Sequence, residues 1–150
     1  MLWEDDAETV RESLVAPVAE KAELDEAELD EAKLIRAYLA RTYLVRANLV
    51  GADLTGANLT GAYLVLADLE RAKLPGANLA GANLGRAKLA GADLVWADLT
   101  GADLTGADLT GANLAGAKLA GADLTEANLA EAYLGGAYLD DGSREQGGAR

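Results

Sequence analysis

The 150-residue chain contains no cysteine, no histidine and no phenylalanine, and only one methionine. The first two absences exclude disulfides, thiol nucleophiles, histidine bases and the usual zinc ligands. The chain has no apolar run of the roughly 18 residues that a membrane-spanning helix needs. Its first residues are acidic, where a secretory signal would be basic. We therefore expect a cytoplasmic protein without a cofactor, a metal site or a membrane contact.

Negative charge exceeds positive charge, but unevenly along the chain. The formal net charge is −12. Residues 1–31 hold twelve acids against two bases, whereas residues 32–139 hold ten acids against nine bases. The acidity, which would otherwise indicate a basic partner and repel nucleic acid, therefore belongs to the N-terminal end.

What the sequence has in abundance is a five-residue repeat. Twenty-four consecutive copies of Ala-x-Leu-x-x run from Ala22 to Asp141, and Thr42 is the single replacement of the alanine. On an α-helix, leucines five apart would step about 140° round the axis and form no stripe. In a straight strand, successive copies would face opposite sides. The chain must therefore bend once per copy, so that stacked coils bring Ala and Leu into one core.

The bend is expected at the last two positions of each copy, which are rich in glycine and small residues. Thr55-Gly56 and Thr60-Gly61 are typical, and glycine there suits a turn with positive φ. Larger residues hold the same position in other copies: Arg36, Arg41, Arg46, Leu66, Arg71, Arg86, Trp96 and Glu126. We therefore expect that positive φ is not obligatory at this position.

Copies such as Ala-Asp-Leu-Thr-Gly and Ala-Asn-Leu-Ala-Gly resemble the A(D/N)LXX signature of pentapeptide-repeat proteins, over about four fifths of the chain. The resemblance implies an all-β fold, a right-handed quadrilateral β-helix with four copies per coil and hence about six coils. Periodicity alone does not distinguish four sides from three. We expect this pentapeptide-repeat solenoid over residues 20–141, a short N-terminal capping helix with its lead-in over 1–19, and a disordered polar tail over 142–150.

The two ends carry different signals. Trp3, Ala7, Val10 and Leu14 share one face of a short helix, which indicates a lid on the first coil or, alternatively, a docking helix for another protein. No such lid follows the last coil, which carries Tyr133 and Tyr138. This coil is therefore a candidate for homodimer formation, as related proteins are known to dimerise through their C-terminal ends.

Positions 20 apart stack on one side if a coil holds four copies, and one group of columns is distinctive. Tyrosine, arginine and exposed aliphatic residues on neighbouring strands are typical of a protein-binding surface. The alternative is ordinary cross-strand pairing that stabilises the sheet. Trp96, beside Val95, forms a smaller apolar spot on the opposite side. The protein-interaction candidates are Tyr43, Val45, Arg46, Tyr63, Val65, Leu66, Arg86 and Trp96.

These features favour a structural, protein-binding scaffold with an unknown protein partner and no direct contact with nucleic acid. The alternative comes from the resemblance: some pentapeptide-repeat proteins mimic duplex DNA, bind type II topoisomerases such as gyrase and confer quinolone tolerance. A rod of about 29 Å would then have to match roughly 17 phosphate charges, which a near-neutral repeat region does not. The acidic strip candidates for this reading are Asp93, Asp98, Asp103, Asp108 and Asp123.

An enzyme is the third possibility, and the sequence disfavours it. Paired carboxylates such as Asp98 and Asp103 are able in principle to perform acid/base chemistry. A thin convex rod, however, offers no pocket that excludes water or shifts their pKa values. We therefore predict no catalytic residue, no cofactor-binding residue and no metal ligand. The regularity of the repeat is also compatible with a consensus sequence selected for folding alone.

Overall fold

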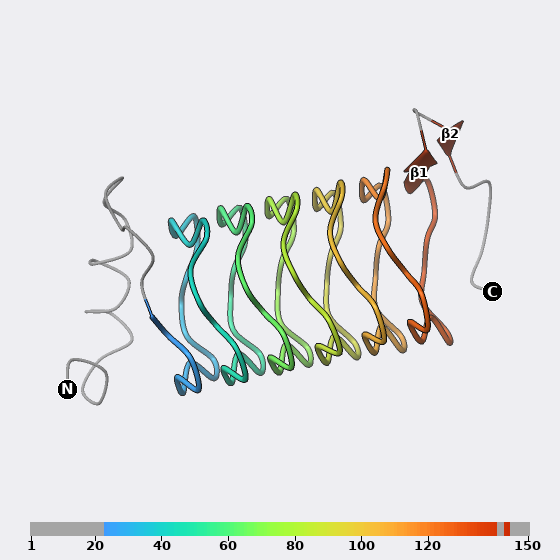
Figure 1. Ribbon diagram of the computed structural model, residues 1–150. Coiled ribbons are helices and arrows are strands. Elements are labelled where there is room, and N and C mark those ends of the chain that lie inside the picture. The colour runs from blue at the N-terminus through green and yellow to red at the C-terminus, as the bar shows by residue number, and fades with distance from the viewer. Residues whose placement is uncertain (1–22, 141–142, 145–150) are drawn as a thin grey trace.

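The computed structural model describes residues 23–140 and 143–144, most of which form one continuous coil wound into a rod (Figure 1). Each second residue of a repeat forms a parallel β-bridge with the residue 20 positions later, from Glu23↔Tyr43 to Lys118↔Tyr138. Four such bridges fall within each 20 residues, so four pentapeptides make one coil. This arrangement agrees with the β-helix expected from the repeat. The capping helix expected over residues 1–19 lies outside the described residues.

Regular strands occur only at the C-terminal end of the described chain. Strand β1 (Tyr138–Asp140) pairs antiparallel with β2 (Ser143–Arg144), with Tyr138 opposite Arg144 and Asp140 opposite Ser143. Ser143 and Arg144 were expected within the polar tail; residues 145–150 of that tail lie outside the described part. Elsewhere each side of the coil contributes a single bridge, because the chain turns again after five residues.

In the repeats that have a described coil on both sides, backbone acceptors account for four of the five amide groups. The second residue donates to the coil before, the leucine and the fifth residue donate to the coil after, and the next alanine closes the turn. One copy shows the pattern: Tyr63 N to Thr42 O at 2.9 Å, Leu64 N to Asn83 O at 2.7 Å, Leu66 N to Gly85 O at 3.0 Å, and Ala67 N to Leu64 O at 3.0 Å.

The one remaining amide, that of the fourth residue, explains why Asp and Asn recur at the second position. Their Oδ1 atom accepts a hydrogen bond from the amide two residues later, as Asp53 does from Thr55 at 3.1 Å. The bond recurs at every Asp and Asn in this position between Asn48 and Asn128. The Asp/Asn preference of the repeat is therefore a requirement of the turn.

Our expectation about the turn's second position is wrong. Every described fifth residue has positive φ, including eleven that are not glycine, whose φ lies between 54° and 59°. The turn places this residue where type II geometry demands positive φ, whatever the side chain. A side chain there costs roughly 1 kcal/mol relative to glycine, and the ladder bonds on both sides hold it in place.

Alanine and leucine fill the axis of the rod, and apart from the partly buried Ala27 of the first coil their burial changes at the C-terminal end. Leu24 is already 2% exposed, and the leucines from Leu34 to Leu114 are almost completely buried. In the last coil, by contrast, Ala132 and Ala137 remain buried but the other six axial side chains are partly exposed: Ala122, Leu124, Ala127, Leu129, Leu134 and Leu139. Thr42, the one replacement of the alanine, is fully buried, and its hydroxyl has no hydrogen-bond partner.

Candidate interaction surfaces

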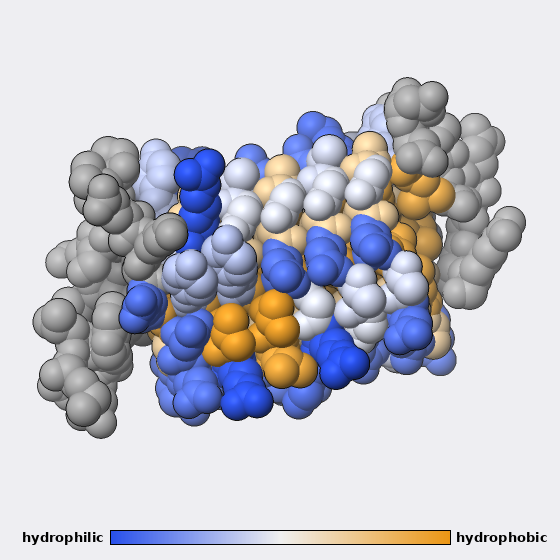
Figure 2. Space-filling view, in the orientation of Figure 1, coloured by the Kyte–Doolittle hydropathy of each residue, from blue (hydrophilic) through white to orange (hydrophobic). Residues whose placement is uncertain are grey.

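One side of the rod brings together seven of the predicted interaction residues. We call residues 41–46, 61–66 and 81–86, which stack in three successive coils, the tyrosine–arginine face. The rings of Tyr43 and Tyr63 lie parallel, with centroids 4.7 Å apart and planes inclined by 7°. Tyr63 is 40% exposed and Leu66 is 42% exposed. Figure 2 shows this cluster of apolar side chains towards the N-terminal end, bordered by hydrophilic residues.

The two tyrosines replace the residue types that the turn prefers. Asn83, next in the same column, accepts a hydrogen bond from the Gly85 amide at 3.0 Å, which a tyrosine ring does not reproduce. The Val45 amide instead donates to Asp25 Oδ1 in the preceding coil at 2.7 Å. The Val65 amide donates to no group among the described residues. At positions 43 and 63 the tyrosine–arginine face therefore lacks the side-chain acceptor of the turn and carries an aromatic ring instead.

The edge of this face also departs from the pattern of the other edges. Elsewhere a large fifth residue lies over a glycine in the next coil, as Arg36 lies over Gly56, whose position would place a Cβ 3.5 Å from the arginine Cγ. On this edge Glu26, Arg46, Leu66 and Arg86 follow one another without a glycine. Arg46 pairs with Glu26 at 3.6 Å, and both side chains are mostly exposed. The result is a ridge beside the tyrosine stack.

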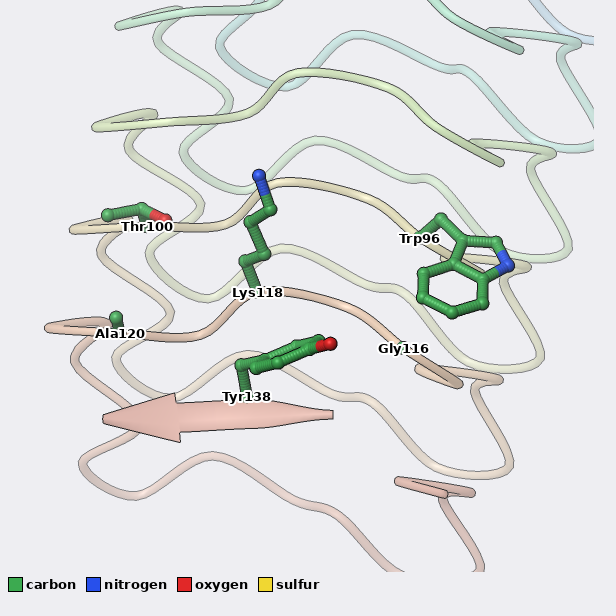
Figure 3. A pocket seen from close by; sticks show the side chains of 6 residues that line it. All are labelled: Trp96, Thr100, Gly116, Lys118, Ala120 and Tyr138. Atoms are coloured by element: carbon green, nitrogen blue, oxygen red, sulfur yellow. The ribbon is translucent and has the colours of Figure 1, made fainter. Parts of the chain in front are cut away.

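Trp96 lies on a different edge and is not brought together with the tyrosine–arginine face. It is 66% exposed, and its indole covers the buried Gly116 of the next coil, where an added Cβ would lie 2.5 Å from the ring. Beside it is a groove of about 310 Å³ (Figure 3). The residues that line this groove are Trp96, Thr100, Gly116, Lys118, Ala120 and Tyr138. Sequence columns did not predict it, because it spans an edge and a side of the rod.

The five predicted acidic-strip residues do not form one strip. Asp103 and Asp123 are bridged in one column, whereas Asp93, Asp98 and Asp108 belong to the three other columns. The five carboxylates therefore surround the C-terminal half of the rod. Each also has a structural role, because its Oδ1 accepts the turn amide.

Hydrogen bonds lower the pKa of three of these carboxylates. The pKa of Asp108 is lowered by bonds from the Thr110 hydroxyl and amide, and the pKa of Asp123 is lowered in the same way by Thr125. Partial burial acts to raise the pKa of Asp98, but hydrogen bonds from Thr100 and the charge of Lys118 outweigh it, so that the pKa falls. Lys118 Nζ lies 3.7 Å from Asp98 Oδ2.

Charge along the rod is segregated in a way that our reading of the sequence missed. Residues 32–91 hold eight bases against three acids, a net of +5, whereas residues 92–139 hold seven acids against one base, a net of −6. The two blocks cancel when residues 32–139 are counted together. The signal was present in the sequence, but only a count by coil makes it visible.

Within residues 23–140 and 143–144, no three acidic side chains gather in a group that could hold a metal ion. The same part of the chain contains no helix long and apolar enough to cross a membrane.

The family model for pentapeptide repeats matches the chain in eight copies, over residues 22–61, 67–106 and 107–141. No curated protein matches it. Among solved structures, the pentapeptide-repeat protein Rfr23 from the cyanobacterium Cyanothece 51142 is 42% identical, with a TM-score of 0.57. The match covers 57% of this chain, which spans 58% of the Rfr23 chain.

Two further solved structures are similar. HetL, a pentapeptide-repeat protein involved in heterocyst differentiation regulation from Nostoc sp. strain PCC 7120, is 36% identical, with 85% of this chain and 78% of HetL covered and a TM-score of 0.48. A trypsin-treated form of QnrB1, a plasmid-mediated fluoroquinolone resistance protein, is 22% identical, with 85% and 63% covered and a TM-score of 0.55. At this identity the QnrB1 likeness concerns the fold alone.

Proposed function

The chain belongs to the pentapeptide-repeat family, and we propose that it is a non-catalytic interaction module that binds another protein through the tyrosine–arginine face. The observation that carries this proposal is the Tyr43–Tyr63 stack, in which Tyr43 is half-buried and Tyr63 is exposed, beside the exposed Leu66. Tyrosine side chains, with two rotatable χ angles, lose little conformational entropy when they are buried at an interface, and arginine is one of the residue types enriched in such contacts. The rod adds rigidity, because its backbone ladder fixes both tyrosines one coil apart.

A purely stabilising role explains this face less well. The repeat supplies Asn or Asp at the second position and glycine at the fifth wherever the turn alone decides. Tyr63 and Leu66 depart from both preferences within one copy, and each leaves two fifths of its surface exposed. Burial of Tyr63 and Leu66 by a partner protein would explain why these residues replace the Asn or Asp and the Gly of the repeat.

The test is a variant in which the face returns to the repeat pattern: Tyr43→Asn, Tyr63→Asn and Leu66→Gly. Asparagine restores the turn hydrogen bond and glycine relieves the positive φ, so the fold should be retained. The matched control makes equivalent changes on other sides of the rod: Tyr38→Asn, Lys73→Asn and Arg36→Gly. Chemical cross-linking in cell extract followed by mass spectrometry would identify partners of each form.

We expect the wild type and the control to cross-link to the same partner and the face variant to lose it. Equal recovery by all three forms would exclude the tyrosine–arginine face as the contact surface. Thermal unfolding of each form, followed by circular dichroism, would establish that a lost cross-link reflects a lost contact.

We also propose that the last coil pairs with a second copy of the chain. The amides of Leu124, Leu129 and Leu134 donate to no acceptor among the described residues, whereas the equivalent leucine amides of earlier coils all do. Their side chains are partly exposed at the same end, together with Tyr133 at 50%. An open coil of this kind is a template for pairing, and it favours an end-to-end homodimer.

Sedimentation velocity tests this homodimer. We expect the wild type to sediment as a dimer and Leu129→Asp to sediment as a monomer. A wild type that is monomeric at all concentrations would refute the homodimer.

One observation favours DNA mimicry as a second candidate. The acidic block of residues 92–139 spans about 2.4 coils, or roughly 12 Å. Duplex DNA carries about seven charges over that length, close to the net of −6 in this block. The basic block next to it opposes such a role over the rest of the rod. Inhibition of gyrase supercoiling by the protein would support mimicry, and activity unchanged at micromolar concentrations would remove it.

A further inference from the structure

The charges of the tyrosine–arginine face are all of one sign. Its three layers contain Arg41, Arg46 and Arg86 and no carboxylate. All three arginines are exposed. Acidic residues begin immediately beyond both ends of the face, with Asp25 and Glu26 in the preceding coil and Asp103 in the following one. The face is therefore a short basic and aromatic area enclosed by acidic ends.

Two of the arginines lie in line with an exposed aliphatic side chain. Arg46, Leu66 and Arg86 occupy the same edge one coil apart, so the two arginine backbones are separated by roughly 10 Å along the rod. Arg86 has no carboxylate within ion-pair distance among the described residues, and its stem extends over Gly106. Arg46, by contrast, is already paired with the exposed Glu26.

A partner cannot reach this face by adding a β-strand. The ladder amides of Leu44, Leu64 and Leu84 already donate to the coil after them, so their backbone groups are occupied. Recognition must therefore come from side chains of the partner. An α-helix laid along the rod presents residues seven apart about 10.5 Å from each other, and it presents the residue between them on the same face.

From this match we propose that the partner presents an acidic amphipathic helix. Two of its carboxylates pair with Arg46 and Arg86. An aliphatic residue between these carboxylates packs against Leu66 and the Tyr43–Tyr63 stack. This inference rests on the proposed function and names the chemistry of the partner. A nucleic acid fits less well, because its continuous phosphate charge would meet Asp25 and Glu26 at one end and Asp103 at the other. A short acidic segment avoids both ends.

The test uses fluorescence anisotropy with a labelled, alanine-based helical peptide in which one Leu stands between two Glu residues seven positions apart. Comparison peptides carry Lys in place of both Glu residues, or Ala in place of the Leu. A labelled DNA duplex serves as a polyanion without an apolar residue. The protein forms are wild type, Arg46→Gly, Arg86→Gly and the matched control Arg36→Gly, which has the same turn geometry on the diagonally opposite edge.

We expect the Glu/Leu peptide to bind the wild type and the control equally, and each face variant to weaken binding by about threefold or more. Binding should weaken further as salt increases. No preference for Glu over Lys, equal weakening by Arg36→Gly, or tighter binding of the duplex would each overturn the inference. A different result would separate the two proposals. If the arginine variants still cross-link to the cellular partner while Tyr63→Asn and Leu66→Gly do not, the protein-interaction function is supported and the acidic helical partner is rejected.

Discussion

The residue that decides the shape of each repeat is the fifth, which adopts positive φ whether or not it is glycine. Glycine accepts this conformation freely, and any other residue pays a strain that the neighbouring coils must offset. Where a large side chain is used, as at Trp96, the following coil often provides a glycine on which it lies. Strain and packing at this position are therefore coupled across coils.

Two alanine substitutions separate strain from contact. Gly76→Ala adds a Cβ into open space, so we expect a loss of about 1 kcal/mol from strain alone. Gly116→Ala adds the same strain and also displaces the Trp96 ring, so it should cost more. In a Trp96→Gly background the two substitutions should cost the same in urea unfolding. A difference that persists without the indole would contradict this account.

Thr42 offers a stabilising substitution. Its hydroxyl is buried without a partner, which carries a desolvation cost. Thr42→Val keeps the shape and removes the hydroxyl, so we expect an increase in unfolding free energy of about 1 kcal/mol. Thr42→Ser, which retains the hydroxyl and loses a methyl group, should destabilise. If Val stabilised no more than Ser, the hydroxyl would have to be satisfied in solution.

At the scale of the element, the turn depends on a side chain as well as on the backbone. Asp and Asn at the second position supply the acceptor for the amide of the fourth residue, and a threonine at that fourth position adds a second bond, as Thr110 Oγ1 does to Asp108 at 2.6 Å. Both bonds favour the ionised carboxylate, which is why the pKa of Asp108 is lowered.

This coupling predicts the direction of the acid response. A carboxylate with a lowered pKa in the folded state contributes stability above its ordinary pKa of about 4, and that stability is lost as the pH falls through the folded value. Asn keeps the acceptor without titrating. The quadruple variant Asp53→Asn, Asp98→Asn, Asp108→Asn and Asp123→Asn should therefore lose less stability than the wild type between pH 5 and pH 3 in urea unfolding. An identical loss in both would contradict the role of these carboxylates.

The last coil should also differ from the others in amide exchange. Leu64 and Leu84 donate to the next coil, whereas Leu124, Leu129 and Leu134 do not among the described residues. At low protein concentration we expect the latter three to exchange much faster. Protection that grows with concentration would support the proposed homodimer, and strong protection at high dilution would show that another part of the chain covers this end.

At the scale of the whole molecule, the rod combines a uniform core with a segmented surface. Apart from Thr42, the core uses only alanine and leucine from Leu24 to Leu119. The surface changes from acidic over residues 23–31 to basic over 32–91 and acidic again over 92–139. Because the core carries almost no variation, differences in binding must come from the surface positions that depart from the repeat.

The fold was accessible from the sequence because one rule repeats without interruption: the spacing of the leucines from Leu24 to Leu139 required a bend in every copy, and the family resemblance supplied four copies per coil. The positive φ at Arg36 and Trp96 could not be predicted, because non-glycine residues disfavour this conformation and the hydrogen-bond ladder between coils imposes it. The stacking of Tyr43 on Tyr63 followed from the 20-residue period. The groove beside Trp96 did not, because its walls come from sequence positions as distant as Trp96 and Tyr138.

The central claim is that the protein binds its partner through the tyrosine–arginine face, and site-specific photo-cross-linking tests it most directly. A photoreactive amino acid would replace Tyr63 in one form, and Tyr38 and Asn78, on another side of the rod, in two others. We predict that the form labelled at 63 cross-links to a partner protein in cells and that the forms labelled at 38 and 78 do not. Cross-links of equal yield from all three positions, or from 38 and 78 alone, would contradict the claim.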